Sequence, residues 1–201
     1  MVVWVHQSCD KWSLLTFHGA DVVGEFSVTA LLAFYPLVFA SGFLINLFMP
    51  IAYERAGDLY SDEATRSAHR CLLIMTGCYI LGGLLMIIIF GIFNETLVVL
   101  VSNPKYVKFS HLLPGLTISW ALFYLGETLT GFGLIAKNPR IYILPKLTSG
   151  TIAAAGTFYL SSKIGVPGVV WGLGVAGLVY ALWCIMVAFR CVNCGSMMRV
   201  A

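Results

Sequence analysis

Residues 164–189 read IGVPGVVWGLGVAGLVYALWCIMVAF and contain no charged side chain. A helix needs about 20 apolar residues to cross the hydrocarbon core of a bilayer, so this run is long enough to span a membrane. Further uncharged runs occupy residues 26–51, 71–94 and 147–162. Only 10% of the 201 residues are charged and 59% are hydrophobic, whereas soluble domains carry roughly 25% charged residues. The sequence therefore predicts a polytopic membrane protein.

The same run contains the pattern Gly172-x-Gly174-x-x-Gly177, which is typical of dinucleotide-binding turns. That motif works only after a strand, at the start of a helix, and with an acidic residue about 20 positions further on. Here a Pro-Gly pair precedes the glycines, and no Asp or Glu follows Glu127. We therefore exclude a nucleotide site. Together with Gly168, these small residues predict a packing seam that lets the last helix approach its neighbours closely.

The distribution of apolar runs predicts an all-α bundle with five to six transmembrane spans. Residues 51–70 are polar and predict a loop or surface helix, and residues 94–109 are too short and interrupted to cross. Residues 191–201 form a tail after the transmembrane region 1–190. The expected helices are a partial one over 1–19 and full spans over about 24–50, 71–93, 112–136, 141–160 and 166–189.

Basic residues between the spans predict the orientation, because cytoplasmic loops carry an excess of Lys and Arg. The side expected to face the cytoplasm carries Arg55, Arg66, Arg70, Lys137, Arg140, Lys146, Arg190 and Arg199. The opposite side carries only Lys105, Lys108 and Lys163. The C-terminal tail is therefore expected in the cytoplasm.

Polar side chains inside two of the spans are the candidate binding residues. Trp120, Tyr124 and Glu127 lie on one face of the span over 112–136, and Tyr35 and Asn46 share a face of the span over 24–50. An ionisable group in hydrocarbon marks a cavity or a transport pathway, but it also occurs in interhelical hydrogen bonds. Both interpretations stay open for Glu127, whereas we favour an interhelical hydrogen bond for Asn46.

Signatures of enzymes and cofactors are missing from the sequence. The four histidines are dispersed, and neither a nucleophile motif nor a phosphate-binding loop occurs. Cys191 and Cys194 form a single C-x-x-C pair without the further ligands that a zinc site needs. We expect no catalytic residue, metal or cofactor, and the net charge of +3 does not predict a nucleic-acid partner.

Three stretches resemble the polysaccharide transporters, or lipid-linked oligosaccharide flippases, of the multidrug/oligosaccharidyl-lipid/polysaccharide exporter superfamily. The first is DKWSLLTFHGADVVGEFSV over 10–28, with Lys11 where that family has Arg and Phe26 where it has Tyr. The second is NLFMPIAYERAGD over 46–58. The third, residues 134–183, is similar to the family's last two helices, although Ser161-Ser162 replaces the usual Ile-Pro before the turn.

The resemblance implies one lobe, the C-terminal one, of a two-lobe transporter in the bacterial cytoplasmic (inner) membrane. Such a transporter moves a polyprenyl-pyrophosphate-linked sugar between leaflets during polysaccharide or lipopolysaccharide synthesis for the cell envelope. The partner is then a missing N-terminal lobe or a second copy of the chain, and the partial first helix favours a fragment. Lys11 is the cation inside the membrane that suits a pyrophosphate, although we favour a simple pairing with Asp10 at a helix break.

Two other functions remain open from the sequence. An ion-coupled exporter of cationic drugs would favour acidic cavity residues and would not require Lys11, and Glu127 would then respond to a coupling ion. A membrane-embedded scaffold or half-transporter without transport activity is the other alternative.

Overall fold

The computed structural model describes residues 2–57 and 62–193, and over these residues the chain is entirely helical. Seven α-helices and two short 3-10 helices follow one another. They are α1 (Val2–His18), α2 (Ala20–Ala56), α3 (Asp62–Ile92), α4 (Asn94–Val101), η1 (Pro104–Leu112), α5 (Leu113–Ile135), η2 (Pro139–Tyr142), α6 (Ile143–Ile164) and α7 (Val166–Asn193). The predicted all-α architecture is confirmed.

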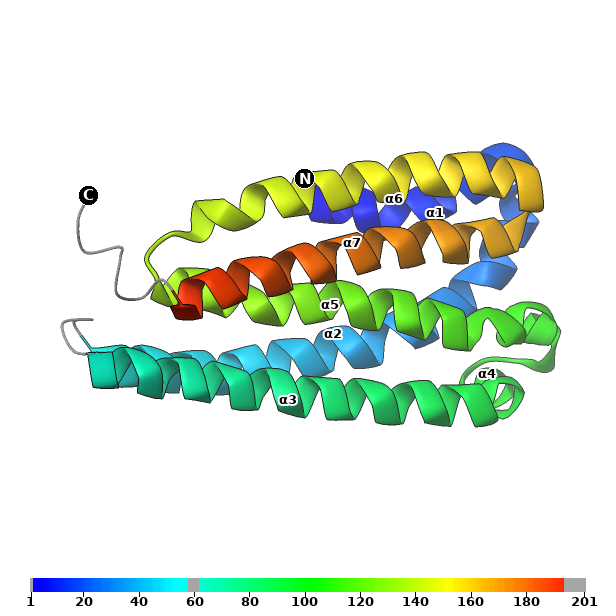
Figure 1. Cartoon of the computed structure of the whole chain (residues 1–201). Coiled ribbons are helices and arrows are strands. Elements are labelled where there is room, and N and C mark those ends of the chain that lie inside the picture. Colours follow the sequence, from blue (N-terminus) through cyan, green and yellow to red (C-terminus); the bar gives the residue numbers. More distant parts are fainter. Residues whose placement is uncertain (1, 58–61, 194–201) are drawn as a thin grey trace.

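The long helices run up and down beside one another in an elongated bundle (Figure 1). Helices α5 and α7 pack together in the middle; α2 and α3 cover α5, and α6 covers α7. Helix α1 packs against α6 and α2 and begins about half-way along the bundle. Because α5 contacts helices on several sides, its residues supply much of the core.

Four helical segments are long and apolar enough to cross a membrane: Ala20–Ala56, Glu63–Ile92, Pro104–Ile135 and Val166–Val192. Four such segments indicate a multi-pass membrane protein. The span expected over 141–160 corresponds to α6, which packs along α7 but is not among the four. Lys146, Lys163 and several hydroxyl side chains make α6 less apolar, although its 22 residues would reach across the hydrocarbon core.

The boundaries of two helices differ from the sequence prediction. Instead of a loop or surface helix over 51–70, the structure continues α2 to Ala56 and begins α3 at Asp62. Apolar composition marks only the part of a helix that meets lipid, and the backbone hydrogen bonds continue through the charged turns beyond it. The short helices α4 and η1 occupy the stretch that was expected not to cross.

The glycines of the last helix form the predicted packing seam. A Cβ added at Gly172 would lie 2.6 Å from the backbone nitrogen of Thr157 in α6. A Cβ added at Gly177 would lie 2.7 Å from the backbone oxygen of Ser119 in α5. Backbone atoms of both neighbours thus occupy the space that a side chain would need. The prediction of close helix approach through these glycines is confirmed.

Candidate functional site

A cavity of about 240 Å³ lies between α1, α2 and α5. Its wall includes Lys11, Tyr35 and Trp120, three of the six residues predicted to bind substrate. Helix α1 contributes residues 4, 7, 8, 10 and 11, and the spacing of 4, 7, 8 and 11 by three to four places these four on one helical face. The structure therefore brings together predicted residues from three helices that are far apart in the sequence.

Asp10 and Lys11 both line this cavity. The Asp10 side chain is buried, with 2% of the residue exposed, and its Oδ1 accepts a hydrogen bond of 2.7 Å from the backbone N–H of Lys11. Within the described part of the chain, neither side chain forms an ion pair. The two charges therefore do not meet in a side-chain ion pair, and Asp10 instead accepts a hydrogen bond from the Lys11 backbone.

The aromatic residues of α5 divide between the cavity wall and the core. Trp120 is 3% exposed and lines the cavity, and its Nε1 has no hydrogen-bond partner among the described residues. Its ring meets Phe34 of α2 edge-on, with 4.9 Å between centroids. Tyr124 is buried beside the cavity without lining it, and its hydroxyl accepts a 3.3 Å hydrogen bond from Gln7 of α1.

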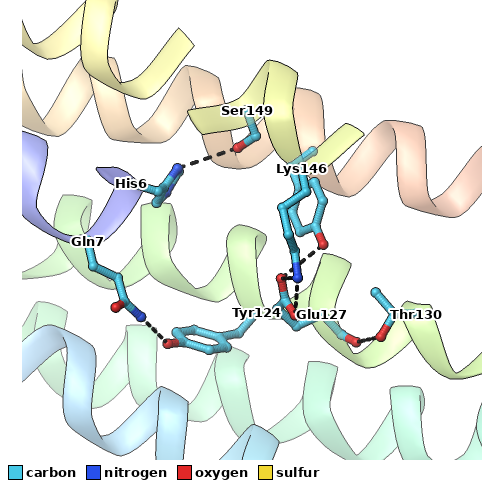
Figure 2. A network of polar contacts seen from close by, with 8 residues as sticks. His6, Gln7, Tyr124, Glu127, Thr130, Lys146 and Ser149 are labelled. Atoms are coloured by element: carbon cyan, nitrogen blue, oxygen red, sulfur yellow. Dashed lines mark hydrogen bonds and ion pairs between the residues drawn. The ribbon is translucent and has the colours of Figure 1, made fainter. Parts of the chain in front are cut away.

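Glu127 lies in an interhelical network and does not line the cavity (Figure 2). The Lys146 Nζ of α6 lies 2.8 Å from its Oε1, and the Tyr180 hydroxyl of α7 donates a 2.9 Å hydrogen bond to the same oxygen. The Glu127 and Lys146 side chains are 21% and 29% exposed, so both are largely withdrawn from the surface. Of the two interpretations for Glu127, this arrangement matches the interhelical one.

Sequence reasoning missed Lys146 and Tyr180 as partners of Glu127. By sequence Lys146 is one of the basic residues that predict the orientation, and Tyr180 gives no signal in an apolar run. Helix α6 packs chiefly against α7 and α1, so the long Lys146 side chain has to reach α5 past its immediate neighbours. The nearest sequence signal was the pair of opposite charges inside two successive predicted spans.

A column of aromatic rings in contact with one another connects the cavity wall with this network. His6 of α1 is buried, meets Trp120 edge-on and stacks on Phe123, with 4.2 Å between the centroids of His6 and Phe123. Phe123 in turn stacks on Tyr180 at 5.1 Å. Figure 2 shows the contact of His6 with Ser149 of α6. The Ser149 hydroxyl oxygen lies 3.5 Å from the His6 Nδ1. Nothing in the sequence singles out His6, since its partners lie on other helices.

The remaining predicted residues of α2 lie on its exposed side. Tyr35 is 49% exposed at the edge of the cavity and stacks on Phe39 with 6.0 Å between centroids. Asn46 is about 17 Å further along α2, at 1.5 Å per residue, and is exposed. It makes no hydrogen bond to another described residue, so the interhelical bond expected for it is not formed within this part of the chain.

The structure describes one cysteine of the C-x-x-C pair. Cys191 is buried in α7, whereas Cys194 lies outside the described residues. Among residues 2–57 and 62–193, no three His, Cys, Asp or Glu side chains are grouped as a metal site would require.

Comparison of the chain with protein-family models, with curated proteins and with solved structures finds no match. The resemblance to polysaccharide transporters therefore stays a prediction that rests on the residues quoted above.

Proposed function

We propose that the chain forms one lobe of a transporter that moves lipid-linked saccharide units across a bacterial cytoplasmic membrane. The observation that carries the proposal is the cavity between α1, α2 and α5, where charged and hydrogen-bonding side chains line a space within a bundle of apolar helices. Polar groups at such depth are costly unless they serve a ligand or a pathway. The resemblance of residues 10–28, 46–58 and 134–183 to lipid-linked oligosaccharide flippases supports the same class of substrate.

In this proposal Lys11 meets the pyrophosphate and the aromatic side chains meet the sugar. A sugar head group cannot cross hydrocarbon unaided, because its hydroxyl groups would lose their hydrogen-bond partners. A polar cavity that opens alternately to the two sides would carry the head group while the lipid tail stays in the bilayer. Tyr35 and Trp120 provide ring faces beside Lys11 on the same cavity wall.

A second lobe, or a second copy of the chain, is the proposed partner. The exposed side of α2 carries Phe39 next to the cavity edge at Tyr35, and Asn46 about 17 Å further along the helix. An exposed amide on an apolar helix is better satisfied by protein than by lipid tails. We therefore place the partner against this side of α2, where it would complete the cavity.

The test is flipping of a fluorescent undecaprenyl-pyrophosphate-linked sugar in proteoliposomes that contain the full chain. We expect Lys11→Ala to slow flipping about tenfold or more, because a hydrogen bond to a charged group contributes about 1.5–3 kcal/mol and 1.4 kcal/mol corresponds to a factor of ten. Lys163→Ala is the matched control, since this lysine is exposed at the end of α6. Equal rates for both variants would contradict the proposal, and wild-type chain without flipping activity would contradict a second copy of the chain as the partner.

Asp10 favours a second candidate, the ion-coupled exporter of cationic compounds. A buried carboxylate on the cavity wall suits a cationic substrate better than an anionic one. This candidate predicts that ethidium is transported along an imposed pH gradient, that Asp10→Asn abolishes the transport, and that Lys11→Ala leaves it intact. Lys11→Ala therefore separates the two functions, because it slows transport under the first and leaves transport intact under the second. A chain that transports neither probe would be a non-transporting membrane protein.

A further inference from the structure

The cavity wall carries one acceptor and one donor whose hydrogen-bonding capacity is not used. The Asp10 carboxylate is buried, and its one side-chain hydrogen bond within the described chain is to the neighbouring backbone N–H of Lys11. A carboxylate has about four acceptor positions, so most of its capacity remains. On the opposite helix, the buried Trp120 Nε1–H has no partner among the described residues. Buried polar groups in folded proteins are normally satisfied, so the Trp120 Nε1–H calls for a partner, and Asp10 can accept further hydrogen bonds.

The charges on the wall narrow the class of that ligand. Asp10 disfavours an anion inside the cavity, and the adjacent Lys11 disfavours a cation. A hydroxyl group is both donor and acceptor, so a neutral polyhydroxyl compound satisfies Asp10 and Trp120 at the same time. The aromatic side chains Phe34 and Tyr35 on the same wall suit the C–H face of a sugar ring.

The size of the cavity limits the ligand to one ring. Pockets for drug-sized ligands measure roughly 300–1,000 Å³, whereas this cavity measures about 240 Å³. An oligosaccharide would have to extend out of it, and Tyr35 at the exposed edge marks where the chain would leave.

We infer that the cavity is a subsite for a single neutral sugar ring, in which Asp10 accepts hydrogen bonds from ring hydroxyl groups and Trp120 Nε1 donates one. The inference rests on the proposed function and identifies which part of the carried unit enters the cavity. Lys11, beside Asp10, then meets the pyrophosphate attached to that ring.

Saturation-transfer NMR on the full chain in a detergent without sugar groups tests the subsite directly. The probes are the methyl glycosides of glucose, galactose and N-acetylglucosamine, with tetrahydropyran-2-methanol as a ring that lacks the ring hydroxyl groups. We expect at least one glycoside to bind with millimolar affinity, and both Trp120→Phe and Asp10→Asn to weaken it about tenfold. The matched controls Trp171→Phe and Asp21→Asn change exposed residues outside the cavity wall and should leave the affinity unchanged.

Trp120→Phe is expected to fold, because it removes a donor that makes no hydrogen bond while keeping an aromatic ring. The thermal unfolding midpoint checks this, and the isosteric Asp10→Asn gives an independent variant. The inference is overturned if no glycoside binds the wild-type chain, if tetrahydropyran-2-methanol binds equally well, or if both cavity variants bind like the wild type.

Failure of the subsite and failure of the proposed function give different results. If glycoside binding depends on Asp10 and Trp120 but no lipid-linked sugar is flipped, the proposed function fails and the subsite stands. If flipping of the lipid-linked sugar is unchanged in Trp120→Phe and Asp10→Asn, the subsite fails and the transport function stands.

Discussion

Removing the charges of the Glu127–Lys146 pair singly and together gives the sharpest test of the interhelical network. In Lys146→Met the Glu127 carboxylate keeps only the Tyr180 hydroxyl as a partner from another helix. In Glu127→Gln the ammonium loses its carboxylate, although the amide oxygen can still accept from Tyr180. The double variant replaces both charges with neutral groups of similar shape.

The burial of the ion pair determines how much free energy of unfolding each variant should lose. Breaking a fully buried pair costs about 3–5 kcal/mol, whereas an exposed pair contributes about 0–1 kcal/mol. With side chains 21% and 29% exposed, Lys146→Met should lower the free energy of unfolding by about 2 kcal/mol, between these limits. Glu127→Gln should cost about 1 kcal/mol, because the flexible lysine stem lets the ammonium group reach the bundle end. The double variant should cost only about 1 kcal/mol, since no uncompensated charge is left.

Unfolding in mixed micelles with increasing dodecyl sulfate, followed by far-UV circular dichroism, measures these free energies. Lys163→Met is the matched control, because this exposed lysine forms no ion pair with a described residue, and it should change stability by less than about 0.5 kcal/mol. The expected coupling between the two single variants is about 2 kcal/mol. Additive costs, with a coupling below about 0.5 kcal/mol, would refute the ion pair as a stabilising contact.

Two glycine substitutions test the packing of α7. Gly172→Ala places a Cβ against the backbone of Thr157, which cannot move aside. We therefore expect the free energy of unfolding to fall by about 2–3 kcal/mol. Each kcal/mol should lower the thermal unfolding midpoint by about 2–4 °C. Gly126→Ala collides with the buried Tyr180 ring and should cost about 1–3 kcal/mol by the same measurement. Gly82→Ala meets no atom within 4 Å and should instead stabilise α3 by up to about 1 kcal/mol. A destabilised control, or unchanged midpoints for the first two, would argue against this packing.

The sequence predicts the membrane helices well where apolar composition and helix length coincide. The span expected over 112–136 is α5, Leu113–Ile135, and the span expected over 166–189 is α7, Val166–Asn193. The predicted helix boundaries are wrong where a helix extends beyond its apolar part, as at the end of α2 and the beginning of α3. Hydropathy reports the solvent around a helix, whereas the ends of a helix depend on backbone hydrogen bonds and caps.

The candidate site was predicted only in part, and the reason lies in the neighbours of α5. Trp120 and Glu127 are seven residues apart, which places them on nearly the same face of a helix. They nevertheless meet different partners, because α1 begins about half-way along the bundle (Figure 1). Gln7 of α1 still reaches Tyr124, but Glu127, nearly one turn further along α5, meets Lys146 of α6 and Tyr180 of α7. A face defined by periodicity carries no information about which helix covers each of its turns.

One face of α5 therefore contributes to two different regions, the proposed binding cavity and a stabilising ion pair. The cavity wall is made by α1, α2 and α5, whereas the ion pair joins α5 to α6 and α7. The ring column from Trp120 through His6 and Phe123 to Tyr180 makes the two regions contiguous, yet contiguity alone does not establish energetic coupling. A loss of transport in Glu127→Gln is therefore evidence for a role of Glu127 in binding only when the folded fraction is unchanged. Trp120→Phe separates a loss of binding from a loss of folding more cleanly, because it alters the cavity wall without removing any hydrogen bond between described residues.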